Sequence, residues 1–323
     1  ERIVCFSHKR YPSIMKKLIL FSPLWMYAST ALFGGSPKDE ISRILQESGL
    51  KGGFVVHVGS KDGTATTALR PSDGYQAQAL VMDASKLDAV RKEIREEAGT
   101  YGPIAADSWK GGKLPYVDNM VNLLLIEEGA EVSQKEIQRV LTPLGKAYQK
   151  KDGKWKVIDK QWPKDIDEWT HYLHGADGNA VAKDTRVGPP RRLQWVGSPR
   201  WSRHHDRMAS MSAMTSTKGR LFYVMDEGSR VSIQLPPSWK LIARDAFNGV
   251  VLWKREIPKW HHHLWPLKSG PTQLARRLVT KGDRVYFTLG ITAAVSALDA
   301  TSGKTLVTYK GSEGSEEILV AGG

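Results

Sequence analysis

The sequence predicts a Rossmann-like α/β domain followed by an all-β, incomplete β-propeller. Two observations predict this division of the 323 residues. Between residues 35 and 160, apolar strand-like runs alternate with amphipathic helix patterns, an order typical of a mostly parallel sheet. Beyond residue 218, short apolar runs separated by glycine turns recur as two similar units. The single cysteine, Cys5, excludes a disulfide framework.

The first 34 residues predict two segments: residues 1–14, translated from upstream of the true start (upstream read-through), and a signal peptide that begins at Met15. Met15 is the first methionine, two lysines follow it, and a mostly apolar run extends from Leu18 to Phe33. This order is the export pattern, and the small residues Ser29 and Ala31 predict cleavage after Ala31. The run is shorter than the roughly 20 apolar residues that a membrane-spanning helix needs. We therefore expect an extracytoplasmic protein, periplasmic or secreted, without a stable membrane span after cleavage; a buried N-terminal helix is the alternative.

Each element of the α/β domain, 35–160, is predicted by its own hydrophobic pattern. Apolar residues that recur every three or four positions predict helices, and continuous apolar runs predict buried strands. The expected elements are, in order, helix 41–50, strand 54–58, helix 64–69, strand 77–82, helix 85–98, strand 102–106, strand 121–126 and helix 135–141. Their order predicts a mostly parallel sheet.

Candidate ligand-binding residues follow the predicted strands. Gly59 comes directly after the first strand and Gly63 follows four residues later, where glycine lets the backbone approach a ligand closely. Asp83 ends the second strand, where a carboxylate can bind ribose hydroxyls. Asp107 ends the third strand. These residues predict a binding edge for a phosphate or nucleoside.

The segment 55–63 resembles motif I of class I S-adenosylmethionine-dependent methyltransferases. Segments 114–124 and 137–145 resemble later motifs of the same family, in the same order. The resemblance implies that Gly59 and Gly63 face the methionine end of S-adenosylmethionine. It also implies that Asp83 contacts the ribose and Asp107 the adenine region.

Three departures from this methyltransferase pattern weigh against catalysis. His57 stands where the family has an acid, Lys61 replaces the central glycine, and Leu144 replaces the first glycine of a Pro-Gly-Gly turn. An exported domain would also meet no S-adenosylmethionine outside the cytoplasm. We therefore expect a non-catalytic or ligand-binding exported module. An active, cytoplasmic S-adenosylmethionine-dependent methyltransferase is the alternative.

An internal repeat marks the all-β region, 219–323. Residues 243–253 align with 297–307 at an offset of 54, and each unit contains a glycine turn between strands. The repeat resembles the blades of pyrroloquinoline-quinone-type β-propellers, most clearly at Asp245, Gly249 and Trp253. Val307 stands at the tryptophan position of the second unit.

Two such units cannot close a propeller ring of roughly four to eight blades. We therefore expect a fragment whose partners include the downstream blades of its own longer chain. The second unit should then expose apolar residues on its outer face, such as some of Val285, Phe287, Val295 and Leu298. Segments 167–174 and 200–206 resemble the junction of exported bacterial proteins in which a methyltransferase-like domain precedes such a propeller. A pyrroloquinoline-quinone-dependent dehydrogenase is a second alternative, but two blades should not bind the quinone.

The junction, 161–218, is rich in tryptophan and histidine. His171 and His174 are three residues apart, as two ligands on one helix face would be, and His204 and His261 add imidazoles that suit zinc or copper. Aromatic and histidine packing at a domain junction is the competing interpretation, and we expect no metal site. The net charge of 47 − 34 = +13 is dispersed, without a long basic run, so we expect no nucleic-acid partner.

Overall fold

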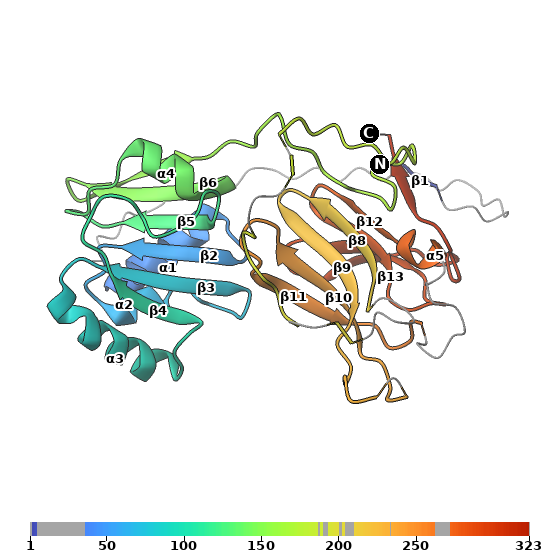
Figure 1. The fold of residues 1–323 in the computed structure, drawn as a ribbon, viewed down its shortest axis with the longest axis horizontal. Coiled ribbons are helices and arrows are strands. Elements are labelled where there is room, and N and C mark those ends of the chain that lie inside the picture. Colours follow the sequence, from blue (N-terminus) through green and yellow to red (C-terminus); the bar gives the residue numbers. More distant parts are fainter. Residues whose placement is uncertain are drawn as a thin grey trace, which may run out of the picture.

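A computed structural model describes residues 2–4, 36–186, 188–189, 193–199, 202–203, 210–232, 234–261 and 272–322. The expected signal peptide and His204 lie outside the described residues. Figure 1 shows an α/β domain beside an all-β region, with the longest axis of the molecule running through both. No helix in the described ranges is both long and apolar enough to cross a membrane.

The α/β domain contains all the expected elements, with small shifts at their ends. They are α1 (Pro37–Ser48), β2 (Gly53–Val58), α2 (Gly63–Thr67), β3 (Tyr75–Val81), the 3₁₀ helix η1 (Ala84–Lys86), α3 (Leu87–Ala98), β4 (Ile104–Ser108), β5 (Val121–Ile126) and α4 (Gln134–Val140). Two further strands, β6 (Leu141–Lys151) and β7 (Lys154–Asp159), were not predicted. They form an antiparallel hairpin at the end of the domain.

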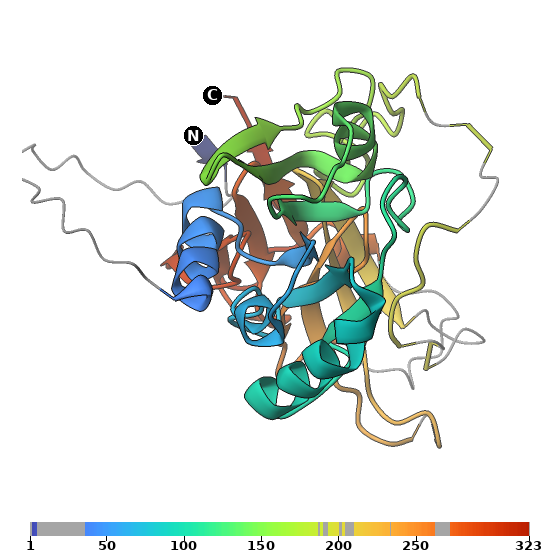
Figure 2. The same ribbon diagram turned by 90° about the vertical axis from the view of Figure 1, so that its left-hand side faces the viewer.

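One six-stranded sheet, in the order β4-β3-β2-β5-β6-β7, forms the centre of this domain. Its first five strands are parallel, and only β7 runs antiparallel. Helices α1, α2 and α3 pack on one face and α4 on the other (Figure 2). Because the chain proceeds outward from β2 in both directions, the carboxyl ends of β2 and β5 flank the point where a ligand crevice opens in such sheets.

The all-β region consists of two four-stranded antiparallel sheets, in the orders β11-β10-β9-β8 and β12-β13-β14-β15. Their strands are β8 (Met211–Thr217), β9 (Arg220–Asp226), β10 (Trp239–Asp245), β11 (Val251–Glu256), β12 (Leu278–Lys281), β13 (Arg284–Thr288), β14 (Val295–Asp299) and β15 (Thr305–Thr308). A short helix, α5 (Thr272–Ala275), precedes β12. Strand β8 lies within the stretch expected as a junction, and it is the fourth strand of the first sheet.

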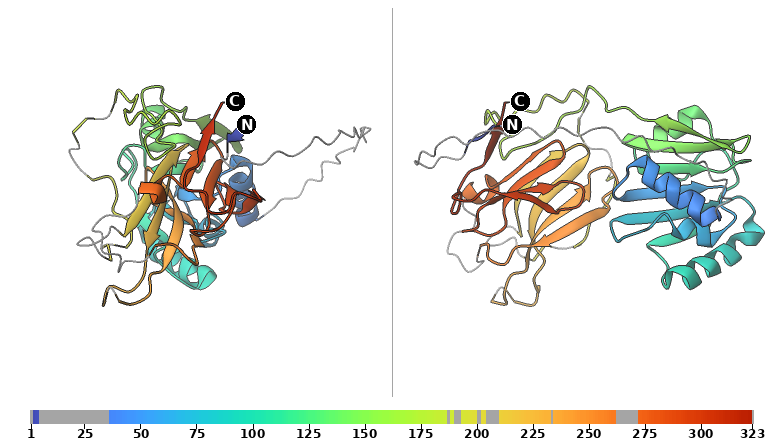
Figure 3. Two further views of the ribbon diagram at one scale, coloured as in Figure 1. Left: turned by 90° about the vertical axis from the view of Figure 1, so that its right-hand side faces the viewer. Right: turned by 180° about the vertical axis from the view of Figure 1, so that it is seen from behind.

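The two sheets pack together through an apolar core, and the second sheet is covered on its other face as well. Val285, Phe287 and Leu298 face the first sheet, whereas Val295 packs with residues from the C-terminal strand β16 (Leu319–Ala321) and the residue before it. All four side chains are fully buried. The expectation that they form an exposed patch is therefore wrong. Strand β16 pairs with β1 (Arg2–Val4) at the end of the molecule away from the α/β domain (Figure 3).

A repeated tryptophan contact explains the sequence repeat. The indole Nε1 of Trp195 donates to the Ala246 carbonyl at 2.9 Å, and that of Trp253 donates to the Ala300 carbonyl at 3.0 Å. Each tryptophan thereby lies against the glycine turn of the sheet that follows it. Val307, at the corresponding position of the second unit, has a side chain that is 47% exposed.

Asn122 links the α/β domain to the first antiparallel sheet. Its Oδ1 accepts hydrogen bonds from the Phe54 amide and from Asn248 Nδ2, both at 2.7 Å, and its Nδ2 donates to Asp245 at 2.8 Å. Asn122 lies at the amino ends of the parallel strands, so the all-β region packs on that edge. The carboxyl edge faces away from it (Figure 1).

Candidate ligand-binding site

A cleft of about 260 Å³ opens at the carboxyl edge of the parallel sheet. A larger open groove adjoins it, and the two share Met82, Glu128 and Gly129. The cleft is lined by Gly59, Ser60, Lys61, Val81, Met82, Asp83, Lys86, Glu128 and Gly129. It therefore lies where the strand order predicts a ligand crevice.

Gly59 forms the turn that carries the chain over this cleft. Its φ is +77°, and its amide donates to the Leu80 carbonyl at 2.8 Å. A Cβ at this position would lie 3.0 Å from the Cβ of Ala130 and 3.3 Å from that of Glu127. Glycine is therefore required both by the backbone conformation and by the close approach of the loop after β5.

Asp83 presents a carboxylate at the rim of the cleft. One oxygen, Oδ1, accepts from the amide of Ser85 at 3.0 Å and from its hydroxyl at 2.6 Å. These two hydrogen bonds hold the pKa of Asp83 below its ordinary value, so the group stays ionised at neutral pH. The second oxygen has no hydrogen-bond partner among the described residues and can accept from a ligand hydroxyl.

Gly63 and Asp107, the two other candidates, do not line the cleft. The Gly63 amide donates to Glu93 Oε2 at 2.7 Å, and a Cβ there would lie 2.4 Å from the Val90 carbonyl oxygen. Gly63 thus serves the packing of α2 on α3. Asp107 accepts from Gln78 at 2.8 Å and from Arg91 at 3.3 Å. The structure brings Gly59 and Asp83 together at the cleft and places the other two elsewhere.

A buried chain of polar side chains lies beneath the Gly59 turn. His57 Nε2 is 3.1 Å from Glu127 Oε1, and its Nδ1 is 3.0 Å from Thr66 Oγ1. The Thr66 hydroxyl in turn lies 2.9 Å from that of Ser60. In the sequence, His57 stands out only as a departure from the methyltransferase pattern. The signal for this chain is a histidine in an otherwise apolar buried strand, because such a group must find partners.

Opposite charges are balanced in the cleft lining. Lys61 and Lys86 supply two cations, and Asp83 and Glu128 supply two carboxylates. Lys61 is exposed, and it stands at the position where the methyltransferase pattern has a glycine. A cleft with this balance suits a neutral or zwitterionic ligand better than a polyanion.

Two of the candidate metal histidines, His171 and His174, are engaged in structural contacts. His171 and His174 form a tight turn, not a helix: His174 has φ +70°, and the His171 amide donates to its carbonyl at 3.1 Å. The proposed shared helix face is therefore wrong. His171 Nε2 accepts from the Val320 amide at 3.2 Å, and His174 Nε2 lies 2.7 Å from Asp167. The described residues contain no group of three or more histidine, cysteine or acidic ligands, and His261 belongs to no such group.

Stability of the folded protein is expected to fall as the pH drops below about 6.5. Burial, and to a lesser extent Lys281, lowers the pKa of His171 from its ordinary value of 6.5. The unfolded chain then binds the proton more readily, which costs up to about 1.4 kcal/mol per pH unit. Thermal unfolding of wild type and His171→Gln at pH about 7.5 and about 5.5 checks this. An equal loss of Tm in both proteins would contradict it.

Of the comparisons with known proteins, only the one with solved structures gives matches. No family model matches the chain, and no curated protein matches it. One match is a structure provisionally described as an S-adenosyl-L-methionine-dependent methyltransferase of Methanococcus maripaludis. Its TM-score is 0.31 at 20% identity, and the match covers 35% of this chain and 53% of the methyltransferase chain. A SAM-dependent methyltransferase of Aquifex aeolicus has a TM-score of 0.29 and 18% identity, covering 35% and 67%.

A third match is the [4+2]-cyclase SpnF, with a TM-score of 0.31 and 21% identity, covering 34% of this chain and 43% of its own. The chain thus spans about half the length of the first structure that it matches. At these scores the matches assign no family and no activity. The Rossmann-like assignment of the first domain rests on its own strand order.

Proposed function

We propose that the α/β domain binds a nucleoside-type ligand in the cleft at its carboxyl edge, as a ligand-binding rather than a catalytic module. One observation supports this most directly: the Gly59 turn and the available oxygen of Asp83 line the same cleft. A turn that lets backbone approach the ligand and an acid that accepts from ribose hydroxyls are two features of nucleoside sites at this edge.

S-adenosylmethionine fits this cleft only in part. Asp83 lines the cleft and can accept from a ribose hydroxyl, but Gly63 packs against α3 and Asp107 is hydrogen-bonded to Arg91 and Gln78. One of the two glycines expected at the methionine end, and the acid expected at the adenine end, are therefore engaged in other contacts. Lys61 adds a charged side chain to the lining. The cleft residues therefore suit the nucleoside part of S-adenosylmethionine only. We assign no methyl-transfer step to this domain.

The proposal extends to the all-β region, whose two sheets we interpret as adjacent β-propeller blades. Four-stranded antiparallel sheets packed face to face, each bonded to the tryptophan that precedes it, support this interpretation. These blades would serve as a scaffold and meet further blades of a longer chain. Export through the segment that begins at Met15 is also proposed, on the sequence pattern alone.

Asp83→Asn is expected to weaken adenosine binding by at least about tenfold, because a hydrogen bond to a charged group contributes about 1.5–3 kcal/mol. Asparagine is as good a helix cap as aspartate, so the turn at η1 and the Tm should be unchanged. Isothermal titration of the full chain with adenosine measures the effect. Asp107→Asn, an exposed carboxylate at the end of the next strand, is the matched control. Unchanged affinity in Asp83→Asn would overturn the proposal.

A titration with S-adenosylmethionine tests the enzymatic alternative. The proposal predicts that it binds no more tightly than adenosine, since Gly63, one of the two glycines expected at the methionine end, packs against α3 instead. Binding at least about tenfold tighter than adenosine, together with release of S-adenosylhomocysteine on incubation with a methyl acceptor, would favour an active methyltransferase instead.

A further inference from the structure

A second cavity, of about 320 Å³, lies between the two domains at the amino edge of the parallel sheet. It is on the opposite side of the sheet from the nucleoside cleft. The loop after α1 and the start of β6 form one wall, and turns of both antiparallel sheets form the other. Four cationic side chains line it: Lys51, Lys146, Lys218 and Arg220.

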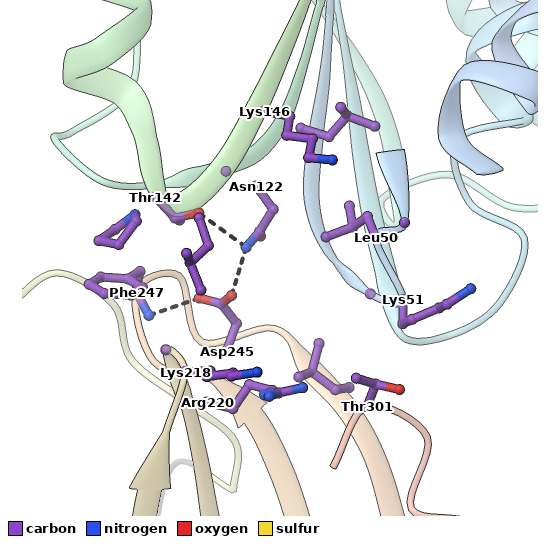
Figure 4. A pocket seen from close by; sticks show the side chains of 18 of the residues that line it. Leu50, Lys51, Asn122, Thr142, Lys146, Lys218, Arg220, Asp245, Phe247 and Thr301 are labelled. Carbon is purple, nitrogen blue, oxygen red and sulfur yellow. Dashed lines mark hydrogen bonds between the residues drawn. The ribbon is translucent and has the colours of Figure 1, made fainter. Parts of the chain in front are cut away.

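Positive charge exceeds negative charge in this cavity. Lys218 Nζ and Arg220 Nη2 share one carboxylate, that of Asp283, at 2.5 Å and 2.9 Å. Lys51 and Lys146 form no ion pair with the described residues. Figure 4 shows Lys146 entering from the α/β domain, with Lys218 and Arg220 side by side on the opposite wall. Asp283 offsets part of this positive charge, and an anion bound in the cavity would offset more of it.

Asp245, the other acid in the lining, already accepts three hydrogen bonds within the protein. Its carboxylate accepts from Asn122 Nδ2 at 2.8 Å and from the amides of Phe247 and Asn248 at 2.8 Å and 3.0 Å (Figure 4). Burial raises its pKa, which disfavours its negative charge further. It holds the domain contact together and is not a counter-ion for Lys146.

Leu144 gives the cavity an apolar wall in an unusual conformation. Its φ is +65°, which a bulky L-residue rarely adopts, and its side chain is 51% exposed. The turn itself needs no leucine: the Leu144 amide donates to the Lys160 carbonyl at 3.0 Å, a bond that glycine would also make. Phe247 and Leu50 extend the apolar lining. Strained, exposed residues of this kind concentrate at ligand sites.

We propose that this cavity binds a small organic anion with an apolar body, such as an aryl or alkyl phosphate or carboxylate, and that Lys146 and Leu144 contact its two parts. Lys218 and Arg220 contribute from the all-β side, so the ligand bridges the two domains. Apolar walls with a few converging polar groups are typical of small-molecule sites.

Three probes separate the contributions to binding in the full chain: phenyl phosphate, inorganic phosphate and phenol. Isothermal titration should show saturable binding of phenyl phosphate, weaker binding of phosphate, and none of phenol. Lys146→Gln should weaken phenyl phosphate binding by about tenfold, since a charge-assisted hydrogen bond is lost. Lys154→Gln, on the neighbouring strand β7 and outside the cavity, is the matched control and should bind as wild type.

Leu144→Gly provides the sharper test, because it separates binding from folding. Glycine relieves the strained backbone, so the Tm should rise, while affinity for phenyl phosphate falls toward that for phosphate. Asp83→Asn should leave phenyl phosphate binding unchanged, which distinguishes this site from the nucleoside cleft. The proposal is overturned if no anion binds wild type at millimolar concentration, or if neither Leu144→Gly nor Lys146→Gln changes the affinity for phenyl phosphate.

Discussion

Replacing Asp226 by alanine is expected to lower the free energy of unfolding by about 3–5 kcal/mol, because it leaves a buried cation unpaired. Asp226 Oδ2 accepts from Arg203 at 2.8 Å, and the two side chains are 0% and 1% exposed. The other oxygen of Asp226 accepts from the amides of Gly228 and Ser238 at 2.8 Å and 2.7 Å. The variant therefore loses a charge pair and two of the hydrogen bonds that hold the loop between β9 and β10.

Urea unfolding, followed by tryptophan fluorescence, measures this loss. Asp283→Ala is the matched control, because the Asp283 carboxylate also pairs with basic side chains but is 59% exposed. Its loss should be below about 1 kcal/mol, as for surface ion pairs. The double variant Arg203→Met, Asp226→Leu should recover part of the stability, since no charge is then left unpaired. A loss in Asp226→Ala no larger than in the control would contradict the expectation.

Gly303→Ala is expected to cost about 3 kcal/mol, through backbone strain and overpacking together. Gly303 has φ +69°, and a Cβ there would lie 2.7 Å from the ring atoms Cδ2 and Cε3 of Trp253. The indole cannot withdraw without losing its hydrogen bond to the Ala300 carbonyl. Gly249→Ala should behave in the same way, because its Cβ would lie 2.5 Å from the ring of Trp195.

Gly282→Ala separates the two contributions to that loss. Gly282 has a similar φ of +59°, but nothing lies within 4 Å of the position of its Cβ. It should therefore show only the left-handed backbone cost of about 1–2 kcal/mol. Chemical denaturation of the three alanine variants gives the comparison. Equal losses in all three would show that the tryptophan contact does not constrain the glycine turn.

Local sequence patterns were sufficient to predict most elements of the α/β domain. They failed where two elements meet with no turn residue between them. Helix α4 ends at Val140 and β6 begins at Leu141, with no turn residue between them. The apolar residues of the helix therefore run directly into those of the strand. Strand β6 was missed for this reason, whereas β7 was missed although Asp152 and Gly153, a hairpin-turn pair, precede it. The outer face of the second sheet was misjudged because Ile318 and Val320, which cover it, follow only after a turn-rich segment.

The candidate site was predictable as far as it depends on strand ends. Gly59 and Asp83 follow directly from the positions where β2 and β3 stop. The role of Gly63 depends on the Val90 carbonyl, which only the packing of two helices brings close. Likewise His57 meets Glu127 across two adjacent parallel strands, 70 residues apart in the chain. A spacing of three residues, as in His171 and His174, is shared by helices and tight turns and cannot separate them.

The most direct test of the account is a crystal structure of the protein with adenosine bound. We expect adenosine in the carboxyl-edge cleft, with a ribose hydroxyl within hydrogen-bond distance of the available Asp83 oxygen and the ligand passing over the Gly59 turn. Adenosine bound in the cavity between the domains, or no bound adenosine at millimolar concentration, would contradict it.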